Sequence, residues 1–137
     1  MIGKLDHVGI AVTSIEEAMR FYGALGLAID DVEEVPQEGV RVAMIRVGET
    51  RIELLEATRE DSAVAKFLAK RGPGIHHLCF ATDDVRGDDA KLRAAGMEVL
   101  RPEPTRGAGD CWVQFVHPRS AGGVLVELSQ SEGEDSA

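Results

Sequence analysis

The sequence predicts an α+β fold in which two tandem βαβββ modules form a curved sheet around a shared cleft. The prediction depends on an internal repeat. Residues 7–11 match residues 77–81 without a gap at an offset of 70, and Ile52-Glu53-Leu54 matches Val126-Glu127-Leu128 at an offset of 74. Each module therefore begins with a histidine-bearing strand and ends with a glutamate-bearing strand. At 137 residues, the chain is long enough to bury one such core but too short for two large domains.

The first module, residues 4–57, shows its elements through periodicity and capping signals. Alternation over residues 5–12 predicts a strand with His7 on one face. Ser14 and Glu17 form a capping box, which marks the beginning of a helix. The remaining predicted elements are the end of this helix at Gly26, strands over about 27–35, 40–47 and 51–55, and a turn at Gly48-Glu49.

The second module, residues 74–130, repeats this order, and the two modules are expected to form one domain over residues 1–137. Residues 60–72 between them predict a linker helix packed on the sheet. Residues 131–137 predict a disordered acidic tail. The predicted elements of the second module are a strand over 75–82, a helix from Asp84 to Gly96, and strands near 97–102, 111–116 and 123–129. The linker helix has Ala63, Val64, Phe67 and Leu68 on one face.

Composition excludes several classes of function. The net charge is −9 and the chain has no basic stripe, which argues against nucleic acid as a partner. No apolar run approaches the roughly 20 residues of a membrane span, and the first residues do not form a signal peptide, so a cytoplasmic protein is expected. Cys79 and Cys111 are predicted to be reduced thiols without the basic neighbours of a nucleophile. Gly107-Ala108-Gly109-Asp110 predicts a turn and not a phosphate-binding loop, because no helix follows it.

The repeat places chemically unusual residues at equivalent positions. His7 and His77 coincide in the ungapped match, which favours a pair of metal ligands over two core histidines. Strand alternation sends the neighbouring His76 to the opposite face. Glu127 lies among apolar neighbours, where burial of an unpaired carboxylate would cost several kcal/mol. A bound metal ion would remove that cost, and the same argument applies to Glu53.

The sequence therefore predicts a divalent metal site in the cleft, formed by His7, Glu53, His77 and Glu127. Two neutral imidazoles and two carboxylates balance the charge of such an ion and suit Co, Mn, Fe, Ni or Zn better than Ca. The lack of thiolates argues against a structural zinc site. An octahedral ion would keep two positions open for water or substrate. Glu56, by contrast, is expected to point to solvent.

Several segments together resemble a known family. They are Leu5–Ala11, Arg51–Glu56, Asp61–Leu68, Gly74–Cys79 and the stretch from Val116 to Leu128. With the paired βαβββ modules, these segments resemble the vicinal oxygen chelate (glyoxalase-like) superfamily and, more closely, the methylmalonyl-CoA epimerase family. The resemblance covers essentially the whole chain except the acidic tail, and the combination of segments is specific.

This resemblance implies metal-dependent epimerisation of (2R)- and (2S)-methylmalonyl-CoA in propionyl-CoA metabolism, by proton abstraction at C2 through a metal-stabilised enolate. It implies a divalent ion at His7, Glu53, His77 and Glu127, most often Co2+ in preparations, with Mn2+, Zn2+, Ni2+ or Fe2+ as alternatives. It also implies an acyl-CoA substrate and a homodimer. Glu127 is expected to be one proton carrier, and Glu53 or an unidentified group the other. Val42 stands where some relatives carry a glutamate on the third strand.

Four alternatives stay open at this point. A lactoylglutathione lyase-like isomerase would move protons by the same logic on a hemithioacetal. An extradiol dioxygenase would use two histidines and one carboxylate on Fe(II), but Glu53 would then crowd a position needed for oxygen and catechol. A non-catalytic small-molecule binding protein of the same fold would not need all four ligands. A purely structural metal site would load metal without any exchange activity.

Overall fold

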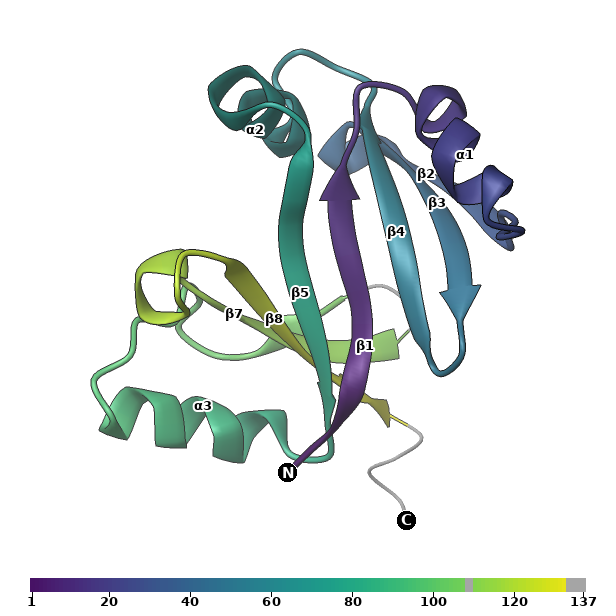
Figure 1. The fold of residues 1–137 in the computed structure, drawn as a ribbon. Helices are drawn as coiled ribbons and strands as arrows, with labels where there is room; N and C mark the ends of the chain where they lie inside the picture. Colours follow the sequence, from purple (N-terminus) through teal and green to yellow (C-terminus); the bar gives the residue numbers. More distant parts are fainter. Residues whose placement is uncertain (108–109, 133–137) are drawn as a thin grey trace. The chain divides into compact units, whose positions relative to one another are not determined.

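The computed structural model describes residues 1–107 and 110–132 and contains two compact units (Figure 1). The first unit is formed by residues 7–76. The second is formed by residues 1–6 together with the chain from residue 77 onward. Each unit contains a strand, a helix and three further strands in that order. The tandem βαβββ arrangement predicted from the repeat is therefore confirmed.

In the first unit, the strands form a four-stranded arrangement in the order β2-β3-β4-β1. β4 is antiparallel to β3 and parallel to β1. The linker helix α2 is present, as the sequence predicts. The elements are β1 (Ile2–Ala11, in this unit from His7 onward), α1 (Ile15–Ala24), β2 (Asp31–Val35), the 3-10 turn η1 (Pro36–Glu38), β3 (Val40–Val47), β4 (Thr50–Ala57), α2 (Ala63–Arg71) and the start of β5 (Gly74–Thr82).

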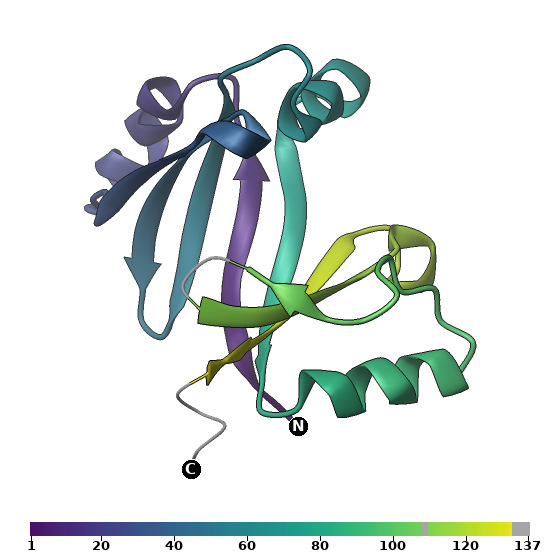
Figure 2. The same cartoon turned by 180° about the vertical axis from the view of Figure 1, so that it is seen from behind.

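The second unit has the equivalent order β5-β8-β7-β6. β8 is parallel to β5 and antiparallel to β7. Helix α3 packs against β7 and β8 (Figure 2), which leaves the other face of these strands without a helix. The elements are the remainder of β5, α3 (Val85–Ala94), β6 (Thr105–Arg106), β7 (Cys111–Val116), the 3-10 turn η3 (Pro118–Ser120) and β8 (Leu125–Ser131).

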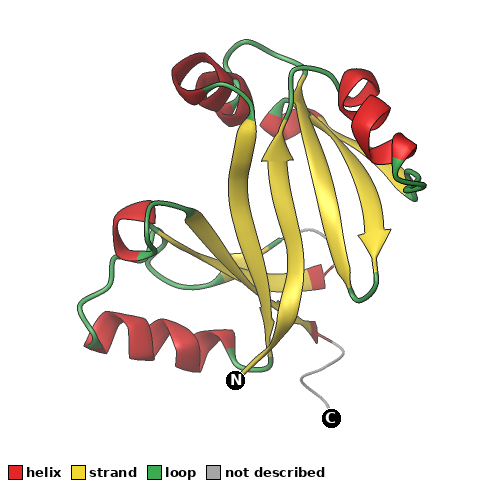
Figure 3. Cartoon of the chain, viewed as in Figure 1, coloured by secondary structure: helices red, strands yellow, loops and turns green. Residues whose placement is uncertain are grey.

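Two apolar clusters hold the first unit together. One joins α1 to one face of β3 and β4, and the other joins α2 to the end of the opposite face (Figure 3). Helix α2 buries Val64, whereas Ala63 is exposed, so the predicted apolar face is correct except at its first residue. The first cluster contains Val12, Ile15, Ala43, Ile45 and Leu54, and the second contains Ala11, Val40, Val42, Leu55 and Val64.

The predicted helix caps are confirmed. The Ser14 hydroxyl accepts a hydrogen bond from the backbone N–H of Glu17 at 2.9 Å. The Asp84 carboxylate accepts one from the backbone N–H of Gly87 at 3.0 Å. Each side chain satisfies one of the N–H groups that the first helical turn leaves without an intrahelical partner. These short polar residues therefore fix where α1 and α3 begin.

The strand predicted over about 27–35 begins only at Asp31. The preceding residues first close helix α1. Gly26 adopts a left-handed conformation (φ 88°), and the Leu27 N–H donates back to the Tyr22 carbonyl at 3.1 Å. This is the hydrogen bond of a Schellman-type helix end, and residues engaged in it cannot also pair as a strand.

The prediction of a strand near 97–102 is wrong. The structure shows a single bridge between Val99 and Val116, and regular pairing with β7 resumes only at β6. Pro102 and Pro104 explain the interruption, because proline has no N–H to donate to a neighbouring strand. The segment is therefore an irregular edge held to β7 at its two ends.

The prediction for Glu56 is also wrong, because its side chain is only 20% exposed. Its carboxylate accepts a hydrogen bond from the backbone N–H of Ile15, the first residue of α1, at 2.7 Å. It also pairs with Arg41 at 3.0 Å. A carboxylate at a helix N-terminus satisfies a free N–H group and interacts favourably with the helix dipole. Glu56 therefore ties α1 to β4.

We expect Glu56→Gln to lower the free energy of unfolding by about 1 kcal/mol, because it removes the charge at the helix N-terminus and the pair with Arg41. Chemical denaturation measures this change. The matched control is Glu34→Gln, since Glu34 pairs with the same Arg41 but is 56% exposed. Its effect should stay within about 0.5 kcal/mol. Equal effects of the two variants would contradict the role given to Glu56.

Among the described residues, Cys79 and Cys111 are thiols that are not joined in a disulfide, as predicted. In the part of the chain that the structure describes, no helix combines the length and apolar character needed to cross a membrane. The predicted turn at 107–110 includes residues 108 and 109, which lie outside the described residues. The prediction of a disordered tail over 131–137 is wrong for its first two residues, because Ser131 is the last residue of β8 and Glu132 is held by an ion pair. Residues 133–137 lie outside the described residues. The described chain ends at Glu132, whose carboxylate pairs with Arg106 at 2.9 Å.

Candidate active site

In the first unit, His7 and Glu53 lie on the sheet face opposite α1. Gly9 is in register with Glu53 across β1 and β4, and His7 precedes Gly9 by two residues on the same face. Nδ1 of His7 lies 3.5 Å from Oε2 of Glu53, and the two side chains are 10% and 12% exposed. The strand register thus brings one imidazole and one carboxylate together in a largely buried position.

Arg51 also contacts Glu53, which the sequence analysis did not predict. Its guanidinium donates to Oε2 of Glu53 at 3.2 Å, the same oxygen that faces His7. Residues two apart on a strand share a face, and this spacing was the available signal. The contact gives the buried carboxylate a positive partner and fixes its orientation.

The second unit contains the equivalent pair, His77 and Glu127. Cys79 is in register with Glu127 across β5 and β8, so His77 lies on the same face as Glu127. Nε2 of His77 lies 3.9 Å from Oε1 of Glu127, and the side chains are 13% and 17% exposed. This face is opposite α3, because Gln130 of β8 points the other way and accepts a hydrogen bond from Val85 of α3 at 2.8 Å.

Each unit therefore presents the same chemical pair, an imidazole beside a carboxylate, on the face opposite α1 in the first unit and opposite α3 in the second. Carboxylates buried to this degree require a nearby positive charge. Imidazole nitrogen and carboxylate oxygen are both ligands of divalent transition metals, and each pair supplies one of each. The residues present thus fit a divalent ion by their donor chemistry.

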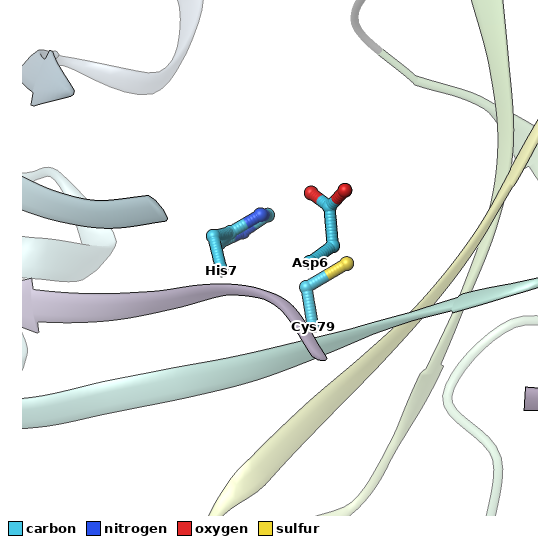
Figure 4. Close-up of side chains that lie close together, drawn as sticks. All are labelled: Asp6, His7 and Cys79. Carbon is cyan, nitrogen blue, oxygen red and sulfur yellow. The ribbon is translucent and has the colours of Figure 1, made fainter. Parts of the chain in front are cut away.

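Asp6 and Cys79 form a further polar pair in the second unit. A carboxylate oxygen of Asp6 and the sulfur of Cys79 lie within 4.8 Å of one another. Figure 4 shows the Asp6 and Cys79 side chains projecting to the same side. Cys79 is fully buried, and its register with Glu127 puts this pair on the face that carries Glu127. Asp6 was not predicted from the sequence, where its only signal is its position directly before His7.

Two other residues considered above, Val42 and His76, contact apolar side chains. Val42 is buried in the cluster beneath α2 and brings no titratable group to the third strand. The His76 ring packs edge-on against Phe67, with the ring centroids 5.1 Å apart. Burial lowers the pKa of His76 below its usual value, because desolvation disfavours the charged imidazolium. His76 is thus a packing residue of the first unit.

Comparison with known proteins relates the chain to one superfamily. Residues 6–115 match the Glyoxalase/Bleomycin resistance protein/Dioxygenase superfamily. The chain is 38% identical over 132 residues to the mitochondrial methylmalonyl-CoA epimerase of Homo sapiens, covering 95% of this chain and 75% of the human protein. It is 41% identical over 133 residues to the ethylmalonyl-CoA/methylmalonyl-CoA epimerase of Cereibacter sphaeroides, covering 95% and 99% of the two chains.

Solved structures give the same result. A variant of Streptomyces coelicolor methylmalonyl-CoA epimerase in complex with 2-nitronate-propionyl-CoA aligns with a TM-score of 0.85 at 41% identity, covering 96% of each chain. A methylmalonyl-CoA epimerase in complex with methylmalonyl-CoA and NH4+ aligns with the same TM-score, identity and coverage. The fold class predicted from the repeat is confirmed by these matches.

Proposed function

This chain belongs to the methylmalonyl-CoA epimerase family of the Glyoxalase/Bleomycin resistance protein/Dioxygenase superfamily, and we propose that it interconverts the (2R) and (2S) forms of methylmalonyl-CoA. The observation that carries the proposal is the similarity along nearly the whole chain to proteins named for this reaction. One similar structure was solved with methylmalonyl-CoA bound. The protein is thus an isomerase of the racemase and epimerase type.

We propose that His7, Glu53, His77 and Glu127 together bind one divalent metal ion. The support is that each unit holds a largely buried imidazole beside a carboxylate, at 3.5 Å and 3.9 Å. These nitrogen and oxygen donors fit Co2+, which we place first, and also Mn2+, Zn2+, Ni2+ or Fe2+. When bound, such an ion supplies positive charge that polarises the oxygens of the substrate and makes the C2 proton more acidic.

Epimerisation needs a proton carrier on each face of C2. The C2–H bond lies between a thioester and a carboxylate, both of which withdraw electrons and stabilise the carbanion left behind. One carboxylate removes the proton, and a second group returns a proton to the opposite face, which inverts the configuration. We assign these roles to Glu127 and Glu53, the equivalent carboxylates of the two units. Val42 cannot serve, because valine has no titratable group.

The proposal extends to the ligand, the assembly and the compartment. The two similar structures solved with CoA compounds support an acyl-CoA thioester as the ligand. We propose a single domain over residues 1–137, and the superfamily match over residues 6–115, which includes parts of both units, supports it. We propose a homodimer in the cytoplasm, a compartment in which two cysteine thiols stay reduced.

The test is to incubate the Co2+-loaded protein with (2R)-methylmalonyl-CoA in D2O and to follow C2 configuration and deuterium uptake in the same sample. We expect inversion with label incorporation, loss of both on chelation, and recovery when Co2+ is returned. Full activity after chelation would contradict the proposed metal site but not the proposed epimerase activity. No exchange with any of the five metals would contradict the epimerase proposal, and a parallel assay on a glutathione hemithioacetal would then test the lactoylglutathione lyase alternative.

A further inference from the structure

We propose that Arg101 binds the free carboxylate of the substrate and so selects carboxyacyl-CoA thioesters over acyl-CoA thioesters that lack this group. The inference concerns the second unit alone. It rests on the proposed function for one point, which is that the reacting carbon lies at Glu127.

The Arg101 side chain is held in a defined place. Its guanidinium carbon lies 4.6 Å from the ring centroid of Phe115, and its NH1 group donates to the Thr105 hydroxyl. Its backbone is held as well, because the Gln114 side chain accepts from the Arg101 N–H at 3.3 Å and donates to the Arg101 carbonyl at 3.0 Å. A half-buried guanidinium fixed in this way has lost most of the conformational freedom that a ligand would otherwise have to remove.

Its positive charge has no protein counter-ion. Among residues 1–107 and 110–132, no carboxylate lies within ion-pair distance of Arg101. Three other arginines of the same unit do have acidic partners: Arg93 pairs with Asp89, Arg106 with Glu132 and Arg119 with Glu98. A partly desolvated guanidinium whose in-plane N–H groups are not used by a carboxylate is suited to bind a planar anion.

The register of the strands places this charge on the same sheet face as the proposed proton carrier, with Phe115 between the two. Phe115 of β7 is directly opposite Glu127 of β8. Directly opposed residues share a sheet face, with Cβ atoms roughly 5 Å apart. The Arg101 guanidinium, the Phe115 ring and the Glu127 carboxylate therefore form one row on the face that α3 leaves uncovered.

This row identifies which anion of the substrate Arg101 would meet. If Glu127 exchanges the proton at C2, the groups near it are those bonded directly to C2, namely the methyl group, the thioester and the free carboxylate. The CoA phosphates lie at the far end of the pantetheine arm, many bonds from C2. The free carboxylate is thus the anion within reach of Arg101, and a charge-assisted pair with it would fix how the acyl group is oriented.

The test compares binding of methylmalonyl-CoA with binding of propionyl-CoA, which is the same thioester without the free carboxylate. Isothermal titration calorimetry is performed on the metal-loaded wild type and on Arg101→Gln. We expect the substitution to weaken methylmalonyl-CoA binding by about tenfold or more and to leave propionyl-CoA binding within about twofold. In the epimerase assay, KM should rise by more than kcat falls, and Arg101→Lys should recover part of the loss because it keeps the charge.

Arg106→Gln is the matched control. Arg106 also lies over an aromatic ring, with its guanidinium carbon 4.7 Å from the ring centroid of Trp112, but its charge is already paired with Glu132. The binding of both ligands by this variant should be unchanged. Equal weakening of both ligands by Arg101→Gln would indicate a CoA phosphate and overturn the inference, as would no weakening at all. If the preference for methylmalonyl-CoA over propionyl-CoA depends on Arg101 but the protein has no epimerase activity, only the proposed function is refuted. An active enzyme without that preference would refute this inference only.

Discussion

Replacing Glu127 with glutamine is expected to lower kcat for epimerisation by about a thousandfold, because general acid–base groups contribute factors of about 100 to 10,000. The amide cannot accept the C2 proton at neutral pH. Glutamine has nearly the same size, and the Glu127 side chain is 17% exposed, so the fold should accept the change. Because Glu127 is also a proposed metal ligand, kcat and KM are measured together with the bound metal and the thermal unfolding of the same sample, which separates lost chemistry from lost metal and lost structure.

Glu53→Gln tests whether the two carboxylates act on opposite faces of C2. With one proton carrier removed, the other still exchanges the C2 proton that points toward it but cannot complete the inversion. Each variant in D2O should therefore label only one of the (2R) and (2S) forms, and the two variants should label opposite forms. Glu132→Gln, at a 51% exposed carboxylate paired with Arg106, should keep full activity. Undiminished inversion by Glu53→Gln would show that another group is the second proton carrier.

The fold could be predicted because the repeat supplied information that a single strand or helix does not. The match of residues 7–11 with 77–81 fixed which strands are equivalent, and the caps at Ser14 and Asp84 fixed where the helices begin. The failure at 97–102 has a local cause. The repeated order of elements predicted a strand in this segment, but Pro102 and Pro104 remove the donors that continuous pairing requires.

The candidate site was predictable to the same extent and for the same reason. The repeat selected His7, Glu53, His77 and Glu127, and within each unit the histidine does lie beside the glutamate, at 3.5 Å and 3.9 Å. The contact of Arg51 with Glu53 was missed because the two-residue spacing that puts both on one face does not reveal whether the arginine is exposed or buried. Glu56 was misjudged for a related reason, since its partner is a backbone N–H of α1, which no residue type reveals.

Asp89→Ala is expected to lower the free energy of unfolding by about 3 kcal/mol, because it removes the acceptor at the centre of a buried polar network. Asp89 is 6% exposed, pairs with Arg93 and accepts a hydrogen bond from Gln114 at 2.9 Å. Gln114 is fully buried, so without Asp89 the side-chain NH2 group of Gln114 would lose one of its hydrogen-bond acceptors while staying shielded from water. Calorimetry should show a fall in Tm of about 10 °C for a chain of this size.

The control for this prediction is Glu98→Ala, which removes an ion pair with Arg119 from a position 49% exposed and should cost less than about 1 kcal/mol.

The network also has a functional consequence that a merely stabilising pair would not have. Gln114 donates to the Arg101 carbonyl at 3.0 Å, and Arg93 donates to the Arg101 and Pro102 carbonyls at 2.6 and 2.9 Å. Asp89 therefore orders, through two intermediaries, the backbone that presents the Arg101 guanidinium. At temperatures where Asp89→Ala is still fully folded, the substitution should weaken the binding of methylmalonyl-CoA more than the binding of propionyl-CoA, as Arg101→Gln does. If Asp89→Ala binds both ligands with the same affinities as the wild type, the network contributes to stability only.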